Sequence, residues 1–82
     1  MTYEEIDKIK RKYGELLQKE RLEHKISKNR MNREAHISIM QTGQIENAET
    51  NYTIESLIRF ADAVNYDVKL IKRKWEFTQI IE

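Results

Sequence analysis

Two short segments with helix-start residues, joined by a tight turn, are the feature that most limits how this chain can fold. Ser27 is placed to cap a helix over residues 27–35. Residues 36–38 then break the helical pattern, and Ser38 is placed to cap a second helix that runs to about residue 47. The sequence therefore predicts a helix-turn-helix unit, which is by itself a common arrangement in helical proteins.

A longer helix is predicted before this unit. Its apolar residues recur three or four positions apart, as on one face of a helix: Tyr3, Ile6, Ile9, Tyr13, Leu16 and Leu17. Thr2 is placed as the N-cap. Gly14 interrupts the stretch, and an interior glycine costs about 1 kcal/mol relative to alanine. Either the helix tolerates Gly14 for close packing, or two helical pieces meet there.

Another helix and a strand are predicted after the unit. Thr53 is placed to cap a helix whose apolar residues are Ile54, Leu57, Ile58, Phe60, Ala61 and Val64. Asn65 suits a left-handed helix end. Beyond it, Tyr66, Val68 and Leu70 alternate with polar residues, which is typical of a strand. This strand has no second strand in the chain to pair with, so a partner is implied.

These elements predict a mainly α, compact bundle of four to five helices with a C-terminal strand. A length of 82 residues fits one core.

The absence of cysteine excludes disulfides and thiolate metal sites, and the two histidines match no zinc pattern, so neither a metal nor a cofactor is expected. The charged N-terminus resembles no signal peptide, and no apolar run approaches the roughly 20 residues of a membrane span. A cytoplasmic protein without a membrane partner is expected.

The charge of the whole chain does not argue for nucleic acid, because 15 basic residues nearly balance 14 acidic ones. A local cluster does stand out, since residues 25–33 contain Lys25, Lys28, Arg30 and Arg33 and no acid. A charge run of this kind is either a solvated face or a surface for an anionic partner.

The order and spacing of several residues resemble the phage repressor and Cro family, also called the XRE family of transcriptional regulators. The resemblance covers residues 14 to about 70 and rests on Gly14, Leu17, Arg21, Ile26, Ser27, the turn His36-Ile37-Ser38, Ile45 and Glu46. It implies a lambda-repressor-like fold in which Arg21 and Glu46 form an ion pair between the first and third helices. Three positions depart from the family pattern: His36 replaces a turn glycine, Thr42 replaces a buried aliphatic residue, and Gly43 weakens the third helix.

The resemblance also implies double-stranded DNA as the partner, with the third helix in the major groove. Base contacts are then expected from Ile39, Met40, Gln41 and Gln44, with an A/T-containing half-site because glutamine can bond adenine at two atoms. Phosphate contacts are expected from Ser27, Lys28, Arg30, Arg33, Ser38 and Asn47. The alternative is that Ile39 and Met40 are core residues and that both glutamines are merely solvated.

The C-terminal strand also resembles the end of HigA-type antitoxins, and this likeness implies a homodimer on a palindromic operator. Residues 1–66 are then the DNA-binding domain and residues 67–82 the dimerisation element. The expected interface residues are Tyr66, Val68, Leu70, Trp75 and Phe77. Trp75, Phe77, Ile80 and Ile81 could instead pack on Tyr3, Ile6 and Ile9 of the first helix.

Two other classes of function compete with a DNA-binding regulator, which would most simply act as a repressor. An enzyme is not expected, because the histidines, serines and acids have no recognisable catalytic spacing. The alternative with more support is an antitoxin or other protein-binding module that keeps the fold and binds a toxin or another protein. The near-zero net charge and the weak third helix favour this alternative.

Overall fold

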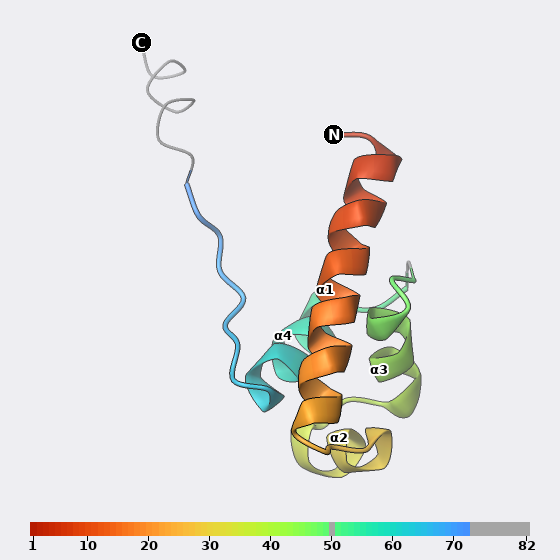
Figure 1. Cartoon of the computed structure of the whole chain (residues 1–82), viewed down its shortest axis with the longest axis vertical. Coiled ribbons are helices and arrows are strands. Elements are labelled where there is room, and N and C mark those ends of the chain that lie inside the picture. Colours follow the sequence, from red (N-terminus) through yellow and green to blue (C-terminus); the bar gives the residue numbers. More distant parts are fainter. Residues whose placement is uncertain (50, 73–82) are drawn as a thin grey trace.

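The computed structural model describes residues 1–49 and 51–72, and this part of the chain is a compact bundle of four helices without a strand. The helices are α1 (Tyr3–Glu23), α2 (Lys28–Ala35), α3 (Ile39–Glu46) and α4 (Ile54–Ala63). Figure 1 shows α1 as the longest element, with α2 across its C-terminal end and its first turns projecting beyond the bundle. Within the described ranges, no helix has both the length and the apolar character of a membrane span.

Each helix begins where its capping residue predicts. The hydroxyl groups of Thr2, Ser27, Ser38 and Thr53 each accept the backbone N–H three residues further on. At Thr2 the bond is reciprocal, because the Glu5 carboxylate accepts the backbone N–H of Thr2. Such bonds satisfy donors that a helix leaves without a partner in its first turn. The predicted starts of all four helices are confirmed.

The long first helix runs through Gly14 without a break. A Cβ atom at Gly14 would lie 2.6 Å from the carbonyl oxygen of Ile45 and 2.8 Å from that of Glu46. The glycine is therefore what lets the backbone of α1 lie directly against the end of α3. Of the two explanations for this residue, close packing is the correct one.

The apolar stripe predicted on α1 is mostly not buried. Leu17 belongs to the core, whereas Tyr3, Ile6, Tyr13 and Leu16 are exposed. Helical periodicity shows which residues share a face, but the other helices of this short chain cover only the C-terminal half of α1 (Figure 1).

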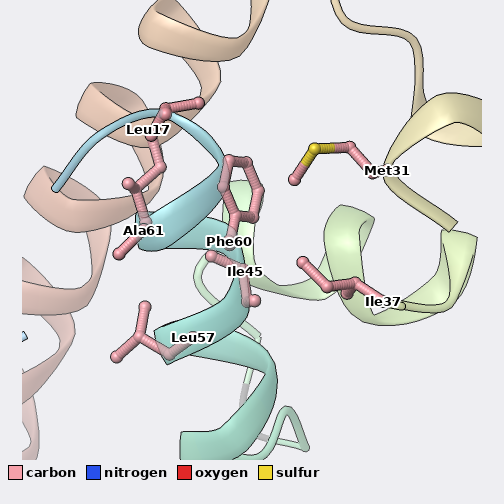
Figure 2. Close-up of a cluster of buried hydrophobic side chains, with 8 residues drawn as sticks. Leu17, Met31, Ile37, Ile45, Leu57, Phe60 and Ala61 are labelled. Atoms are coloured by element: carbon pink, nitrogen blue, oxygen red, sulfur yellow. The ribbon is translucent and has the colours of Figure 1, made fainter. Parts of the chain in front are cut away.

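The hydrophobic core lies where all four helices meet, as Figure 2 shows. Its buried members are Leu17, Met31, Ile37, Ile45, Leu57, Phe60, Ala61 and Val64. Phe60 is fully buried at the centre, and Ile37, the middle residue of the turn, is also enclosed. Burial of Ile37 fixes the turn, and so the angle between α2 and α3, through apolar packing.

Asn65 has the left-handed backbone that the sequence predicts, and so has His36, which stands in place of the turn glycine of the family pattern. His36 ends α2 with φ 59° and ψ 39°, and Asn65 has φ 67° after α4. Histidine and asparagine tolerate this conformation better than most side chains. The turn between α2 and α3 is therefore kept although glycine is absent from it.

The loop between α3 and α4 is held by the N-terminal half of α1. Lys10 Nζ donates a hydrogen bond to the carbonyl oxygen of Glu49 at 2.7 Å and lies 5.0 Å from the centre of the Tyr52 ring. Partial burial, with a smaller contribution from Tyr13, raises the pKa of the Tyr52 phenol. This contact gives the projecting half of α1 a structural role.

Within the described residues, the predicted C-terminal strand is not formed. Residues 66–72 have no strand structure, and Leu70 and Ile71 are almost completely exposed. A strand needs a second strand to complete its hydrogen bonds, and no other segment of the described chain supplies one. Trp75, Phe77, Ile80 and Ile81, the remaining apolar residues of the predicted dimer element, lie outside the described residues.

Thr42 is a buried polar residue in the packed face of α3. Its side chain is fully buried, and its hydroxyl oxygen has no hydrogen-bond partner among the described residues. An unsatisfied buried polar group costs about 1–3 kcal/mol. We expect Thr42→Val, which keeps the branched shape, to raise the free energy of unfolding by about 1 kcal/mol in urea denaturation.

The matched control for this change is Thr53→Val. The Thr53 hydroxyl accepts the backbone N–H of Ser56 at 3.1 Å as the cap of α4, so its removal should destabilise by about 1 kcal/mol. A Thr42→Val variant that is destabilised as much as Thr53→Val would show that the Thr42 hydroxyl has a partner.

Candidate nucleic-acid interface

The candidate interface is held in place by an ion pair between α1 and α3. Arg21 Nε donates to Glu46 Oε2 at 2.5 Å, and Arg21 Nη2 donates to Glu46 Oε1 at 3.1 Å. Only 7% of the Arg21 side chain and 1% of the Glu46 side chain are exposed. This is the pair that the family resemblance implies. It is a bidentate, buried ion pair, and bidentate arginine–carboxylate pairs are among the stronger charged hydrogen bonds.

Further hydrogen bonds extend the pair on both sides. Gln18 Nε2 donates to Glu46 Oε1 at 3.1 Å, and Arg21 Nη1 donates to the carbonyl oxygen of Ile26 at 2.8 Å. Arg21 thus connects α1, the residue before the α2 cap, and the end of α3. Gln18 was not among the predicted site residues, although its place one turn before Arg21 could have indicated it.

The first turn of α3 presents apolar side chains to solvent. Ile39 is 48% exposed and Met40 is 68% exposed. The alternative that these two residues belong to the core is therefore wrong. Large apolar side chains at the open start of a short helix are available for contact with a partner, such as the methyl group of thymine.

The two glutamines of α3 are half-buried and hydrogen-bonded to each other. Gln41 Nε2 donates to Gln44 Oε1 at 2.7 Å, and Gln41 Oε1 accepts the backbone N–H of Thr53 at 2.9 Å. They are therefore not merely solvated. Gln41, predicted as a base contact, instead uses its amide within the protein.

The predicted phosphate contacts are all exposed and lie on α2, α3 and their caps. Lys28 Nζ comes within 3.7 Å of the Cβ position of Gly43, so its charge lies over α3. Arg30 is less available, because its Nε donates to Glu34 Oε2 at 2.7 Å on the exposed face of α2. The hydroxyl groups of Ser27 and Ser38 cap their helices and place the free N–H groups of two helix starts beside this charge.

Two of the three described residues of the predicted dimer interface border an apolar hollow. Tyr66 and Val68 line it together with α1 and α4, and its volume is about 210 Å³. Leu70 lies beyond the hollow and is fully exposed. The side chains that line it from the two helices are Tyr13, Leu16, Leu17, Leu57 and Ala61.

Within residues 1–49 and 51–72, no three histidine, cysteine or acidic side chains are placed to hold a metal ion. Comparison with protein-family models, curated proteins and solved structures gave no significant match. The function of this protein is therefore inferred from the geometry of α2, α3 and their surroundings.

Proposed function

We propose that this protein is a sequence-specific regulator of transcription that binds a palindromic DNA operator as a homodimer and acts as a repressor. In this proposal α3 enters the major groove, and the starts of α2 and α3 contact the phosphate backbone. The observation that carries the proposal is the exposed first turn of α3 beside two capped helix starts and Lys28.

The buried Arg21–Glu46 pair supports this assignment. A recognition helix must keep its angle to the rest of the protein while it contacts DNA, and α3 has only eight residues, one of which is Gly43. Such a helix is weak on its own, because short helices with glycine are intrinsically unstable. The ion pair and the burial of Ile45 hold it against α1 and the core.

The homodimer is supported by residues 66–70 after α4, which have no strand partner within the described part of the chain. Tyr66, Val68 and Leu70 alternate with charged residues, and the backbone there lacks a strand partner. Two copies can pair these segments in an antiparallel ribbon, and a symmetric dimer of this kind would set its two recognition helices about 34 Å apart, one turn of DNA. The operator would then be a palindrome.

A second function, binding of a protein partner such as a toxin, is favoured by exposed apolar side chains away from α3. Tyr13, Leu16, Tyr66 and Val68 are exposed and line one apolar hollow. Clusters of such side chains on soluble proteins often mark protein interfaces. An antitoxin that combines both functions is compatible with this surface.

The proposed function is tested by selecting bound duplexes from a pool of random DNA at two salt concentrations. We expect a palindrome to be enriched and its affinity to fall steeply as the salt concentration rises, because phosphate contacts release counterions. Lys28→Ala should lower the affinity for all sequences and reduce the slope of log affinity against log salt by about 1.

The control for Lys28 is Lys8→Ala. Lys8 is exposed on the projecting half of α1, at the opposite end of that helix from α2 (Figure 1), so its removal should leave the salt slope unchanged. Equal slopes for wild type and Lys28→Ala would reject the proposed placement of α2 on DNA. Failure of the wild-type protein to enrich any sequence would reject the DNA-binding function in favour of the protein partner.

A further inference from the structure

Gln41 connects the loop before α4 to the second glutamine of the recognition helix. Its Oε1 accepts the backbone N–H of Thr53 at 2.9 Å. Its Nε2 donates to the carbonyl oxygen of Asn51 at 3.3 Å and to Gln44 Oε1 at 2.7 Å. Both amide hydrogens and the oxygen of Gln41 therefore have partners inside the protein.

Two backbone groups decide which way this amide is turned. The Thr53 N–H can only donate, so it requires the oxygen of Gln41, whereas the Asn51 carbonyl can only accept, so it requires the nitrogen. Because the amide nitrogen of Gln41 also faces Gln44, the side-chain oxygen of Gln44 must accept the hydrogen bond from it. The orientation of the Gln41 amide thus determines the orientation of the Gln44 amide.

We propose that Gln41 is a positioning residue that makes Gln44 a hydrogen-bond donor toward the bases. The inference rests on the proposed DNA-binding function and narrows what α3 recognises. With its oxygen bonded to Gln41, Gln44 has its amide nitrogen left for a base edge. In the major groove, guanine N7 and O6, thymine O4 and adenine N7 can accept from such a donor, whereas adenine N6 and cytosine N4 are donors themselves.

This geometry changes the expectation drawn from the sequence. A glutamine that recognises adenine uses its oxygen to accept from N6 and its nitrogen to donate to N7. One lone pair of the Gln44 oxygen already accepts from Gln41, and this bond turns the oxygen toward Gln41 rather than toward adenine N6. We therefore expect guanine or thymine, which present acceptors alone, to be preferred opposite Gln44 over adenine, which presents one acceptor beside a donor.

The test is selection from the random DNA pool with the full chain carrying Gln41→Glu. A carboxylate at position 41 can still accept the Thr53 N–H, and it lies in the first turn of α3, where a negative charge is favourable. It cannot donate, so Gln44 must turn its nitrogen inward and its oxygen toward the DNA. We expect the preferred base opposite Gln44 to change from guanine or thymine to adenine or cytosine, by about tenfold in relative enrichment.

Two further variants make this result specific. Gln44→Ala identifies the operator position, because the preference there should disappear. Asn47→Asp adds the same charge to the end of α3 without a bond to Gln44, so it should weaken binding and leave the preferred base unchanged. The same preferred base with Gln41→Glu as with wild type, or the same switch with Asn47→Asp, would overturn the proposal.

The positioning role and the DNA-binding function can fail separately. If the wild-type protein enriches no sequence, the proposed function is rejected, and base recognition by Gln44 is rejected with it. The hydrogen exchange of the Gln41 side-chain amide, measured by NMR on the free protein, then tests the positioning alone. Exchange at least tenfold slower than in free glutamine supports the bonds to Thr53 and Asn51, whereas exchange as fast as in free glutamine overturns them.

Discussion

Replacement of Arg21 by alanine should destabilise the protein by about 3–5 kcal/mol, which is a large part of the stability expected for a domain of this size. The Glu46 carboxylate would lose both Arg21 donors while its side chain stays almost fully buried with only Gln18 as a side-chain donor. The carbonyl oxygen of Ile26 would lose the Nη1 donor as well. Urea denaturation followed by circular dichroism measures the loss directly.

Arg11→Ala on the same helix is the matched control. Arg11 pairs with Asp7 at 2.7 Å, but 63% and 47% of their side chains are exposed, so this change should cost only about 0.5 kcal/mol. If Arg21→Ala were as mild as Arg11→Ala, the burial of the pair would be contradicted.

The double variant Arg21→Met, Glu46→Leu separates the cost of leaving one charge without a partner from the net contribution of the ion pair to the free energy of unfolding. Removal of both charges leaves no buried ion without a partner, and apolar replacements of buried ion pairs are often neutral in stability. We expect it to be more stable than Arg21→Ala. This variant also remains folded if Arg21→Ala does not, and so keeps the comparison measurable.

The local parts of this fold could be predicted from the sequence because the bonds that make them span few residues. Ser27 and Ser38 each cap a helix by accepting the backbone N–H three residues further on, and His36 ends α2 by its own backbone conformation. The Arg21–Glu46 pair spans 25 positions, and it could be predicted only through a family resemblance. No periodicity within one helix indicates which residue of another helix lies opposite.

Other features depend on packing or on a partner and could not be predicted. The amide of Gln41 looks like a base contact in the sequence, and its use inside the protein depends on where the loop containing Asn51 and Thr53 lies. The exposure of Ile6 and Tyr13 follows from how little of α1 the remaining helices cover. The alternation from Tyr66 to Leu70 specifies a strand only where a second strand is present.

Replacement of Gly14 by alanine should destabilise the protein by about 2 kcal/mol, although alanine favours a helix by about 1 kcal/mol over glycine. The new Cβ would lie 2.6 Å and 2.8 Å from two backbone oxygens of α3, closer than real Cβ contacts come. A backbone carbonyl cannot move aside as the end of a flexible side chain can, so α1 and α3 would have to separate. Arg21 and Glu46 lie across the same contact, so their bonds would lengthen too.

Gly43→Ala is the control that isolates this close approach from helix propensity. Gly43 is also in a helix, but a Cβ there meets only Lys28 Nζ, at an ordinary 3.7 Å. We expect Gly43→Ala to stabilise the protein by roughly 0.5–1 kcal/mol, opposite in sign to Gly14→Ala. Two identical substitutions with opposite effects in urea denaturation would locate the constraint at the contact between α1 and α3. Equal stabilisation of both variants would contradict the direct approach of α1 to α3, and with it the rigid attachment of the recognition helix.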